Sequence, residues 1–264
     1  MAKNWYHEVS KDWLKARKNY LTATEIAGLI PEYKRMLKAE EGTISPGFAA
    51  LWAEKLSIGE VDPASFAAAA RGHWMEEPCI DSWNAQRKEK MYHWDDTLIA
   101  KGRVCFSPDG MSIEQPSADV EWVAKDGVIS NASGTHTQPS FIIEIKSFEP
   151  AHHMKCVIAD KMDQEQKILV QLATAFYVLD GLDWAELVFF CPGAPISMKA
   201  FEYTRDDLKV EIELVEKIHE MYAQTIKQCE ELPVDLVAQC NEDEVYKQMV
   251  EENQLNRKDN IMLL

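Results

Sequence analysis

Apolar residues recur with helical spacing near both ends of the chain and with strand-like spacing between them. The sequence predicts helices over residues 5–18, 22–31, most of 46–90, 162–179 and 206–230. It predicts strands over residues 91–94, 98–106, 118–124, 141–146, 185–191 and 197–203, with a short helix or loop over 150–158. Residues 114–139 are less regular, and their polar stretch 130–139 indicates an inserted hairpin and loop. We therefore expect an α/β fold with a central mixed β-sheet flanked by helices.

The chain has the size and composition of a globular protein, with 264 residues, 46% apolar and 27% charged. We expect one domain with a helical part (1–90), a sheet core (91–203) and an acidic helical C-terminal region (204–264). No apolar run approaches about 18 residues and the N-terminus lacks the apolar core of a signal peptide, so we expect a cytoplasmic protein with no membrane contact. The six cysteines form no C-x-x-C pair, which favours buried free thiols over a zinc site or disulfides.

The net charge of −16 argues against a surface that is basic all over, as nucleic-acid binding by the whole surface would require. The charge is unevenly distributed, however. Residues 206–264 contain 15 acidic and 6 basic residues, whereas residues 1–40 contain 8 basic and 5 acidic residues. A local basic surface near the N-terminus therefore remains compatible with a polyanionic partner.

The most informative stretch runs from Cys105 to Lys146. In the predicted strand 141–146, Glu144 and Lys146 point to one face while the isoleucines between and before them point to the other. Upstream, Ser107-Pro108-Asp109-Gly110 places Asp109 at a strand end or tight bend. Two carboxylates brought together can hold Mg²⁺ or Mn²⁺, and a neighbouring lysine can orient water and offset negative charge. The stretch therefore suggests a metal-dependent phosphodiesterase site.

A second candidate site lies near the N-terminus. Thr22-Ala23-Thr24-Glu25 has the form of a capping box, which places Thr24 in the first turn of a helix. The free amides and positive dipole end of that turn, with a guanidinium from Arg17, could bind a phosphate. The alternative is a capped surface helix with an unrelated arginine.

Three further polar groups have both a functional and a structural interpretation. A glutamate on the helix within 66–84 could add a third carboxylate to the metal site or face solvent. Gln171, within the apolar stripe of the 162–179 helix, could line a site or be a core amide with a partner. The adjacent His152 and His153 invite a metal interpretation, but their side chains diverge by about 100° on a helix and lack a third ligand in sequence range.

The pattern Asp109 followed by Glu144-Ile145-Lys146 resembles the PD-(D/E)XK nuclease superfamily, whose core is restriction-endonuclease-like. Together with Gly72-x-x-x-Glu76, Ser107-Pro108-Asp109-Gly110 and Val170-Gln171, it resembles the phage lambda exonuclease and YqaJ-like viral recombinase family. This resemblance implies that Asp109, Glu144 and the backbone of Ile145 bind metal and that Lys146 serves catalysis. It also places Glu76 and Gln171 in the active site, with Glu77 as an alternative to Glu76.

The N-terminal segment extends the same resemblance. Trp13, Arg17 and Thr22-Ala23-Thr24-Glu25 are similar to that family's Trp-x-x-x-Arg and the Thr-Ala-Ser-Glu segment that follows it. The resemblance implies that Arg17 and Thr24 bind the 5′-phosphate of a DNA end, with Thr24 in place of serine. Residues 1–90 would then form the part that binds DNA ends.

The resemblance implies a Mg²⁺-dependent (or Mn²⁺-dependent) 5′-to-3′ exonuclease of the alkaline exonuclease type. Such an enzyme degrades one strand of linear double-stranded DNA and leaves a 3′ overhang for a single-strand annealing protein in recombination. The family also implies a homotrimer and a bacterial or phage-infected host cell. The alternatives are a PD-(D/E)XK endonuclease or repair nuclease, and a catalytically inactive DNA-binding relative.

Overall fold

The structure is a computed structural model that describes residues 11–56, 66–94, 96–115, 121–126, 128–132 and 134–231. The start of the helix predicted over 5–18, the first residues of the strand predicted over 118–124, and the acidic tail beyond residue 231 lie outside these residues. The chain forms two compact units, one of residues 1–27 and 62–216 and the other of residues 28–61 and 217–264. Each unit is described by itself below.

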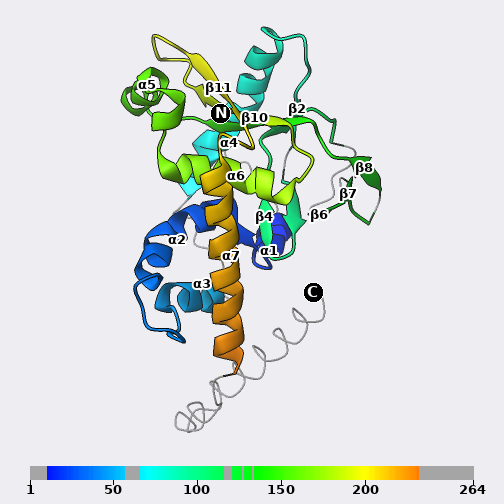
Figure 1. Ribbon diagram of the computed structural model, residues 1–264. Helices are drawn as coiled ribbons and strands as arrows, with labels where there is room; N and C mark the ends of the chain where they lie inside the picture. The colour runs from blue at the N-terminus through cyan, green and yellow to red at the C-terminus, as the bar shows by residue number, and fades with distance from the viewer. Residues whose placement is uncertain are drawn as a thin grey trace, which may run out of the picture. The chain divides into compact units, whose positions relative to one another are not determined.

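The elements follow the predicted order closely (Figure 1). The helices are α1 (Lys11–Arg17), α2 (Ala23–Met36), α3 (Pro46–Leu56), α4 (Phe66–Asn84), α5 (Pro150–Ile158), α6 (Gln166–Val178) and α7 (Lys209–Glu230), with a 3-10 turn at Lys161–Asp163. The strands are β1 (Leu21–Thr22), β2 (Tyr92–His93), β3 (Leu98–Lys101), β4 (Val104–Phe106), β5 (Gly110–Met111), β6 (Glu121–Lys125), β7 (Val128–Ser130), β8 (Thr135–Thr137), β9 (Phe141–Lys146), β10 (Trp184–Phe190) and β11 (Met198–Thr204).

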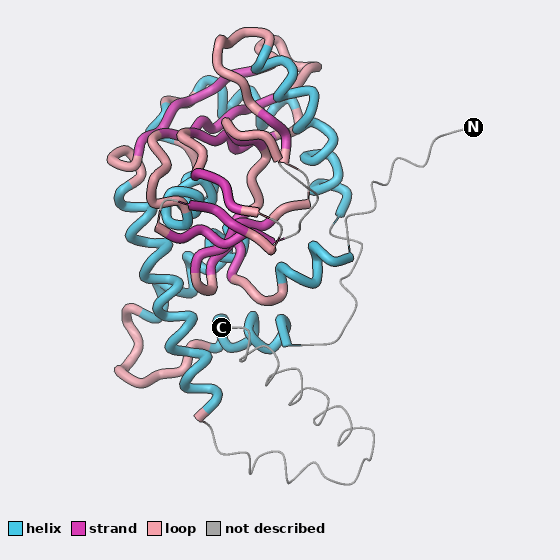
Figure 2. The backbone as a smooth tube through the Cα atoms, turned by 90° about the vertical axis from the view of Figure 1, so that its right-hand side faces the viewer, coloured by secondary structure: helices cyan, strands magenta, loops and turns pink. Residues whose placement is uncertain are grey.

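All of these strands belong to the first unit, where they form two mixed sheets (strands in magenta in Figure 2). The five-stranded sheet has the order β11-β10-β9-β5-β2, with β9 and β10 parallel and the other neighbours antiparallel. The six-stranded sheet has the order β1-β4-β3-β6-β7-β8 and contains both parallel and antiparallel pairs. The predicted mixed α/β class is confirmed, and its strands are divided between two sheets.

Two sequence-based predictions within the six-stranded sheet were wrong in detail. The single strand predicted over 98–106 is a hairpin of β3 and β4, because the chain reverses at Gly102, whose φ of 60° suits glycine. The loop predicted over 130–139 contains strand β8, which pairs with β7 at the edge of the sheet. An edge strand needs few apolar residues, and the polar Thr-His-Thr sequence of β8 was therefore interpreted as a loop.

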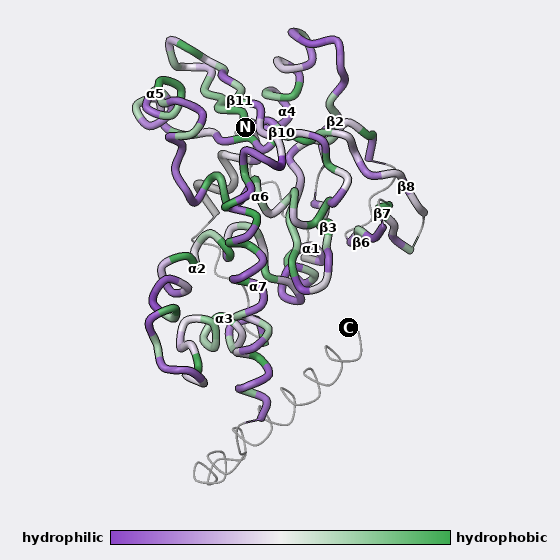
Figure 3. Tube along the Cα trace, viewed as in Figure 1, coloured by the Kyte–Doolittle hydropathy of each residue, from purple (hydrophilic) through white to green (hydrophobic). Residues whose placement is uncertain are grey.

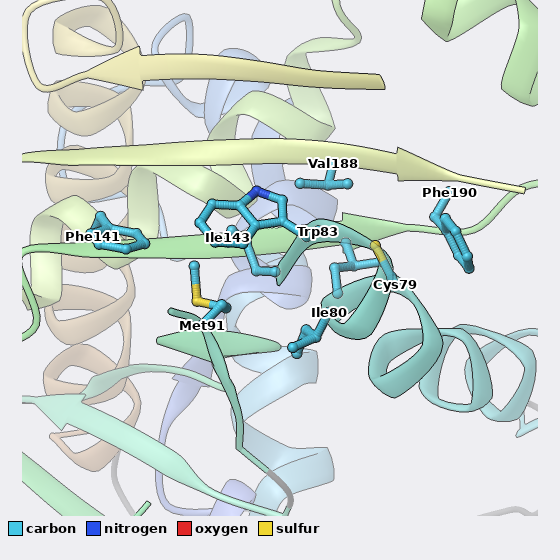
Figure 4. Close-up of a cluster of buried hydrophobic side chains, with 9 residues drawn as sticks. Cys79, Ile80, Trp83, Met91, Phe141, Ile143, Val188 and Phe190 are labelled. Carbon is cyan, nitrogen blue, oxygen red and sulfur yellow. The ribbon is translucent and has the colours of Figure 1, made fainter. Parts of the chain in front are cut away.

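The apolar core that supports the five-stranded sheet lies between α4 and strands β9 and β10 (Figure 4). The residues of this cluster are Cys79, Ile80, Trp83, Met91, Phe141, Ile143, Ile145, Val188 and Phe190. The three from β9 occupy alternate positions, as expected for one face of a strand. The opposite alternation leaves Glu144 and Lys146 on the other face of β9.

A buried carboxylate lies beside this core. Glu186 on β10 is 2% exposed and accepts a 2.6 Å hydrogen bond from the indole N–H of Trp83. Arg87 completes the arrangement with a 2.7 Å ion pair to the same carboxylate. A buried carboxylate is tolerated when it is paired and hydrogen-bonded in this way.

The described part of the second unit is helical. The rings of Phe48 on α3 and Tyr222 on α7 lie 6.3 Å apart. Glu32 accepts hydrogen bonds from Arg35, from the hydroxyl of Ser45 and from the amide of Gly47, and the bond from Arg35 is the main cause of a pKa lowered to about 2. Along α7, hydrophilic and hydrophobic residues alternate as in an amphipathic helix (Figure 3).

The cysteines were expected to be buried free thiols. Among the described residues, four cysteines are buried free thiols and Cys229 is a partly buried one, as expected, whereas Cys240 lies outside the described residues. None of the helices in the described ranges is long and apolar enough to cross a membrane.

Candidate active site

The site begins with the pairing of β5 and β9. Gly110 lies opposite Ile143 in this antiparallel pair, so the register places Asp109, just before β5, opposite Glu144. The amide N–H of Ile145 donates a 2.6 Å hydrogen bond to Oδ2 of Asp109. Asp109 and Ile145, which are 36 positions apart in sequence, are thereby held side by side. We call Asp109 and Glu144 the carboxylate site.

Lys146 completes the predicted Glu-x-Lys arrangement. Its Nζ donates a 2.6 Å hydrogen bond to Oε1 of Glu144 on the same face of β9. The side chains of Lys146 and Glu144 are 19% and 16% exposed, which leaves them reachable by a ligand. The sequence-based expectation that these two groups point together is confirmed by this contact.

The ionisation of the site reflects an excess of negative charge. Burial raises the pKa of Asp109 well above its ordinary value, and the charges of Glu144 and Glu76 raise it further. The positive charge of Lys146 lowers the pKa of Asp109, but by less than burial and the two carboxylates raise it. A divalent cation is the kind of group that would neutralise this excess, and carboxylate oxygens are the ligands that Mg²⁺ and Mn²⁺ prefer. The residues present therefore fit a hard-cation site.

The charge of Lys146 is set by the same neighbours. Burial by itself would lower its pKa, but the negative charges of Glu144 and Asp109 outweigh burial and the pKa is raised. Lys146 is therefore an ammonium group at neutral pH. It can donate hydrogen bonds and offset negative charge, but it carries no free lone pair with which to accept a proton.

Glu76 supplies a third carboxylate near the carboxylate site. It lies on α4, half-buried, and its charge affects the pKa values of both Asp109 and Lys146. Its neighbour Glu77 is exposed, so the helix directs Glu76 and not Glu77 toward the carboxylate site. Of Glu76 and Glu77, between which the sequence did not decide, this geometry favours Glu76.

Glu76 contacts two histidines that the sequence analysis did not single out. Nδ1 of His73 and Nε2 of His93 each lie 3.1 Å from Oε2 of Glu76. Burial would raise the pKa of Glu76, but its hydrogen bonds with His73 and His93 outweigh burial and lower the pKa to about 2. The spacing of His73 and Glu76 along a helix was a readable signal, since residues three apart share a face. Nothing local indicated His93, which arrives from β2.

Cys79 is a further neighbour that the sequence analysis did not assign to the site. It lies one helical turn after Glu76 on α4 and is fully buried. Burial raises the pKa of its thiol, and the charges of Asp109 and Glu76 raise it further. The thiol therefore stays protonated and uncharged near the two carboxylates.

The N-terminal candidate site retains its predicted local geometry. The amide of Thr22 donates to Oε2 of Glu25 at 2.8 Å and the amide of Glu25 donates to the hydroxyl of Thr22 at 3.3 Å, so the capping box is confirmed. Thr24 is exposed in the first turn of α2. The guanidinium of Arg17 lies 4.4 Å from the centre of the Trp13 ring.

The tertiary structure connects the start of α2 to the strands that lead into the carboxylate site. Thr22 pairs with Cys105 in the parallel pair of β1 and β4, and β4 leads directly into the turn that contains Asp109. Gln171 lies half-buried on α6, a helix that packs against β4 and β3. The roles of Arg17, Thr24 and Gln171 stay predictions.

The fold is similar to solved structures of one bacterial enzyme. The crystal structure of an alkaline exonuclease (LHK-Exo) from Laribacter hongkongensis matches with a TM-score of 0.55 and 16% identity, covering 84% of this chain and 95% of that chain. The structure of LHK-Exo in complex with dAMP matches with a TM-score of 0.53 and 19% identity, covering 83% and 95%. No protein-family model and no curated protein matches the chain. At these identities the similarity shows a shared fold.

Proposed function

We propose that this chain, whose fold resembles that of an alkaline exonuclease, is a Mg²⁺-dependent or Mn²⁺-dependent 5′-to-3′ exonuclease acting on linear double-stranded DNA. The observation that carries the proposal is the register of β5 and β9, which sets Asp109 beside Glu144 and Lys146. The fold similarity adds support, because the similar structure is that of an exonuclease. Since that structure also occurs as a complex with dAMP, a deoxynucleoside monophosphate, we propose mononucleotides as the product.

In the proposed mechanism Asp109 and Glu144 would hold the cation, with the backbone carbonyl of Ile145 as a further oxygen ligand. A cation there would supply Lewis-acid chemistry, which lowers the pKa of a water and offsets phosphate charge. The ammonium of Lys146 donates hydrogen bonds, so its role is to orient the attacking water and stabilise the charge that develops on the phosphate. Glu76 and Gln171 line the site. Arg17 and Thr24 bind the terminal 5′-phosphate and so select the strand end.

Partners follow from the same proposal. We propose a single-strand annealing protein as the acceptor of the 3′ overhang, in a phage-infected or bacterial cytoplasm. A ring-shaped homotrimer around the duplex would let an acidic protein bind DNA, because only the inner channel needs basic residues.

The test is digestion of linear duplex DNA labelled at either the 5′ or the 3′ end. With Mg²⁺ we expect early release of the 5′ label as mononucleotide, and we expect EDTA to abolish it. Cleavage of a closed circular duplex would instead indicate an endonuclease. Tight DNA binding with no cleavage under Mg²⁺ or Mn²⁺ would indicate an inactive relative, and either result would reject the proposal.

A further inference from the structure

Two histidines from separate elements converge on one carboxylate oxygen. His73 comes from α4 and His93 from β2, and each ring nitrogen lies 3.1 Å from the same Oε2 of Glu76. The two imidazole rings lie 6.1 Å apart, at an angle of 46°. One possible ligand atom from each of the three residues lies within 4.8 Å of the others. We call these three residues the histidine site.

Two of the three spacings within the histidine site match the spacing of ligands around a metal ion. Two ligand atoms that are each about 2.1 Å from a metal, and roughly 90–110° apart, lie about 3.0–3.4 Å from each other. Both nitrogen-to-oxygen distances at Glu76 fall in this interval, at 3.1 Å. Among the described residues, these three are a group of three histidine and acidic side chains whose possible ligand atoms lie close enough together to hold a cation.

The ligand chemistry differs from that of the carboxylate site. Mg²⁺ prefers oxygen ligands, whereas two imidazoles and one carboxylate favour divalent transition metals and Zn²⁺. We infer that His73, Glu76 and His93 form a second cation site, selective for a divalent transition metal such as Mn²⁺, Co²⁺ or Zn²⁺ over Mg²⁺.

The histidine site is open enough to exchange a cation. The side chains of His73, His93 and Glu76 are 27%, 19% and 16% exposed, so each is largely enclosed yet reachable from solvent. The site also lies within electrostatic range of the carboxylate site, because the charge of Glu76 acts on Asp109 and Lys146. A cation there would add positive charge beside the place where the scissile phosphate is proposed to bind. The inference itself does not depend on nuclease activity, since metal binding is measured without DNA.

The structural alternative is that both histidines simply hydrogen-bond Glu76 and hold it in place. His152 offers a matched comparison, because its Nε2 also lies 3.1 Å from a carboxylate oxygen, that of Glu165, without a second histidine. A single histidine with one carboxylate is a weak metal site, so this pair should not respond to Co²⁺ as the histidine site does.

The experiment is a Co²⁺ titration followed by visible absorption, on protein stripped with EDTA and dialysed. An Asp109→Asn/Glu144→Gln background removes the carboxylate site, so the remaining binding reports the histidine site alone. We expect one equivalent of Co²⁺ to bind this background. We expect added His73→Gln or His93→Gln to weaken binding by at least about tenfold, because loss of even an outer partner of a metal ligand costs 10–100-fold. Added His152→Gln should leave binding unchanged, and excess Mg²⁺ should not displace the Co²⁺.

The inference is overturned if the background binds no Co²⁺ or if His93→Gln leaves binding unchanged. A measurement on the unmodified chain covers the case in which the histidine variants do not fold. With histidine labelled by ¹⁵N, one equivalent of Zn²⁺ should shift the ring resonances of two of the seven histidines. A spectrum in which no histidine responds would reject the site, whatever the outcome of the nuclease assay.

Discussion

At the scale of single residues, Lys146 and Asp109 show how neighbours set ionisation. Each pKa is raised, but for opposite reasons: burial and like charges disfavour the carboxylate of Asp109, whereas opposite charges favour the ammonium of Lys146. The carboxylate site therefore offers negative charge that can attract a cation, and Lys146 beside it offers a hydrogen-bond donor. This is the division of roles that phosphodiester hydrolysis needs.

Lys146→Ala should greatly slow cleavage while leaving DNA binding intact. The substitution removes the ammonium that is proposed to orient water and stabilise charge, so the cleavage rate should fall by at least about 10²-fold. The rate is measured on end-labelled duplex and binding by fluorescence anisotropy in Ca²⁺. Lys101→Ala is the matched control, because Lys101 pairs with the exposed carboxylate of Asp180 and not with the carboxylate site. Wild-type cleavage by Lys146→Ala would show that this residue has been wrongly assigned.

Arg17→Ala should act on the DNA end rather than on the chemistry. Because the guanidinium is proposed to bind the 5′-phosphate, the loss should fall mainly on duplexes with a 5′-phosphate, roughly 10-fold or more. Duplexes with a 5′-hydroxyl should be digested at the rate of the unmodified chain. A steady-state comparison of the two substrates checks this, and an equal loss on both would remove the role.

Asp109→Asn should stabilise the metal-free protein at neutral pH. The raised pKa means that the folded state binds a proton more tightly than the unfolded state, so this contribution is complete below the unfolded pKa of about 3.9 and is lost as pH rises through the folded pKa. Asparagine keeps an oxygen to accept from the Ile145 amide and carries no charge. In EDTA, Tm of the variant should exceed that of the wild type at pH 8, with a smaller difference at pH 4.5. A lower Tm at pH 8 would contradict the electrostatic account.

At the scale of elements, α4 connects the core to the site. Its apolar residues Cys79, Ile80 and Trp83 pack against β9 and β10, while one turn earlier it presents Glu76 to the carboxylates. Near the other end, Trp83 and Arg87 satisfy the buried Glu186 of β10. The same helix therefore carries both the core contacts and Glu76.

Arg87→Ala should destabilise the protein more than loss of a surface ion pair does. It leaves the carboxylate of Glu186 buried with one partner, and we expect a loss of about 1–3 kcal/mol in the free energy of unfolding. Lys101→Ala breaks a pair with the exposed carboxylate of Asp180 and a 3.3 Å hydrogen bond to the carbonyl of Tyr177, and it should cost no more than about 1 kcal/mol. Urea denaturation of both variants measures the difference. Equal costs would mean that the buried position of Glu186 adds nothing.

At the scale of the whole molecule, the described candidate site residues all belong to the first unit, which contains both sheets. The second unit is helical in its described part and carries none of them. Binding of a cation to the carboxylate site therefore acts on the stability of one unit directly.

Mg²⁺ at 100 times its dissociation constant should stabilise the folded first unit by about 2.7 kcal/mol, because it binds the folded state alone. Hydrogen–deuterium exchange should then slow in the slowest-exchanging amides of residues 62–216, with less change in residues 28–56. EDTA should reverse the effect, and Asp109→Asn/Glu144→Gln should show none. Equal protection in that double variant would place the cation elsewhere.

The sequence by itself determined the features that depend on residues close together in the chain. The alternation of β9 puts Glu144 and Lys146 on one face, and the capping box joins Thr22 to Glu25, because strand period and helix ends obey local geometry. Most helices and strands were predictable for the same reason. The hairpin at Gly102 and the edge strand β8 were missed, since their residues are compatible with more than one local conformation.

Only the tertiary structure decided which distant residues meet. The pairing of β5 with β9 holds Asp109 against Ile145, and the packing of α4 beside β2 brings His93 to Glu76. No local pattern contains either contact, because sheet partners are chosen by the packing of the whole unit and not by neighbours in the chain. The raised pKa values arise only there as well, since burial and the approach of charges exist only in the folded state.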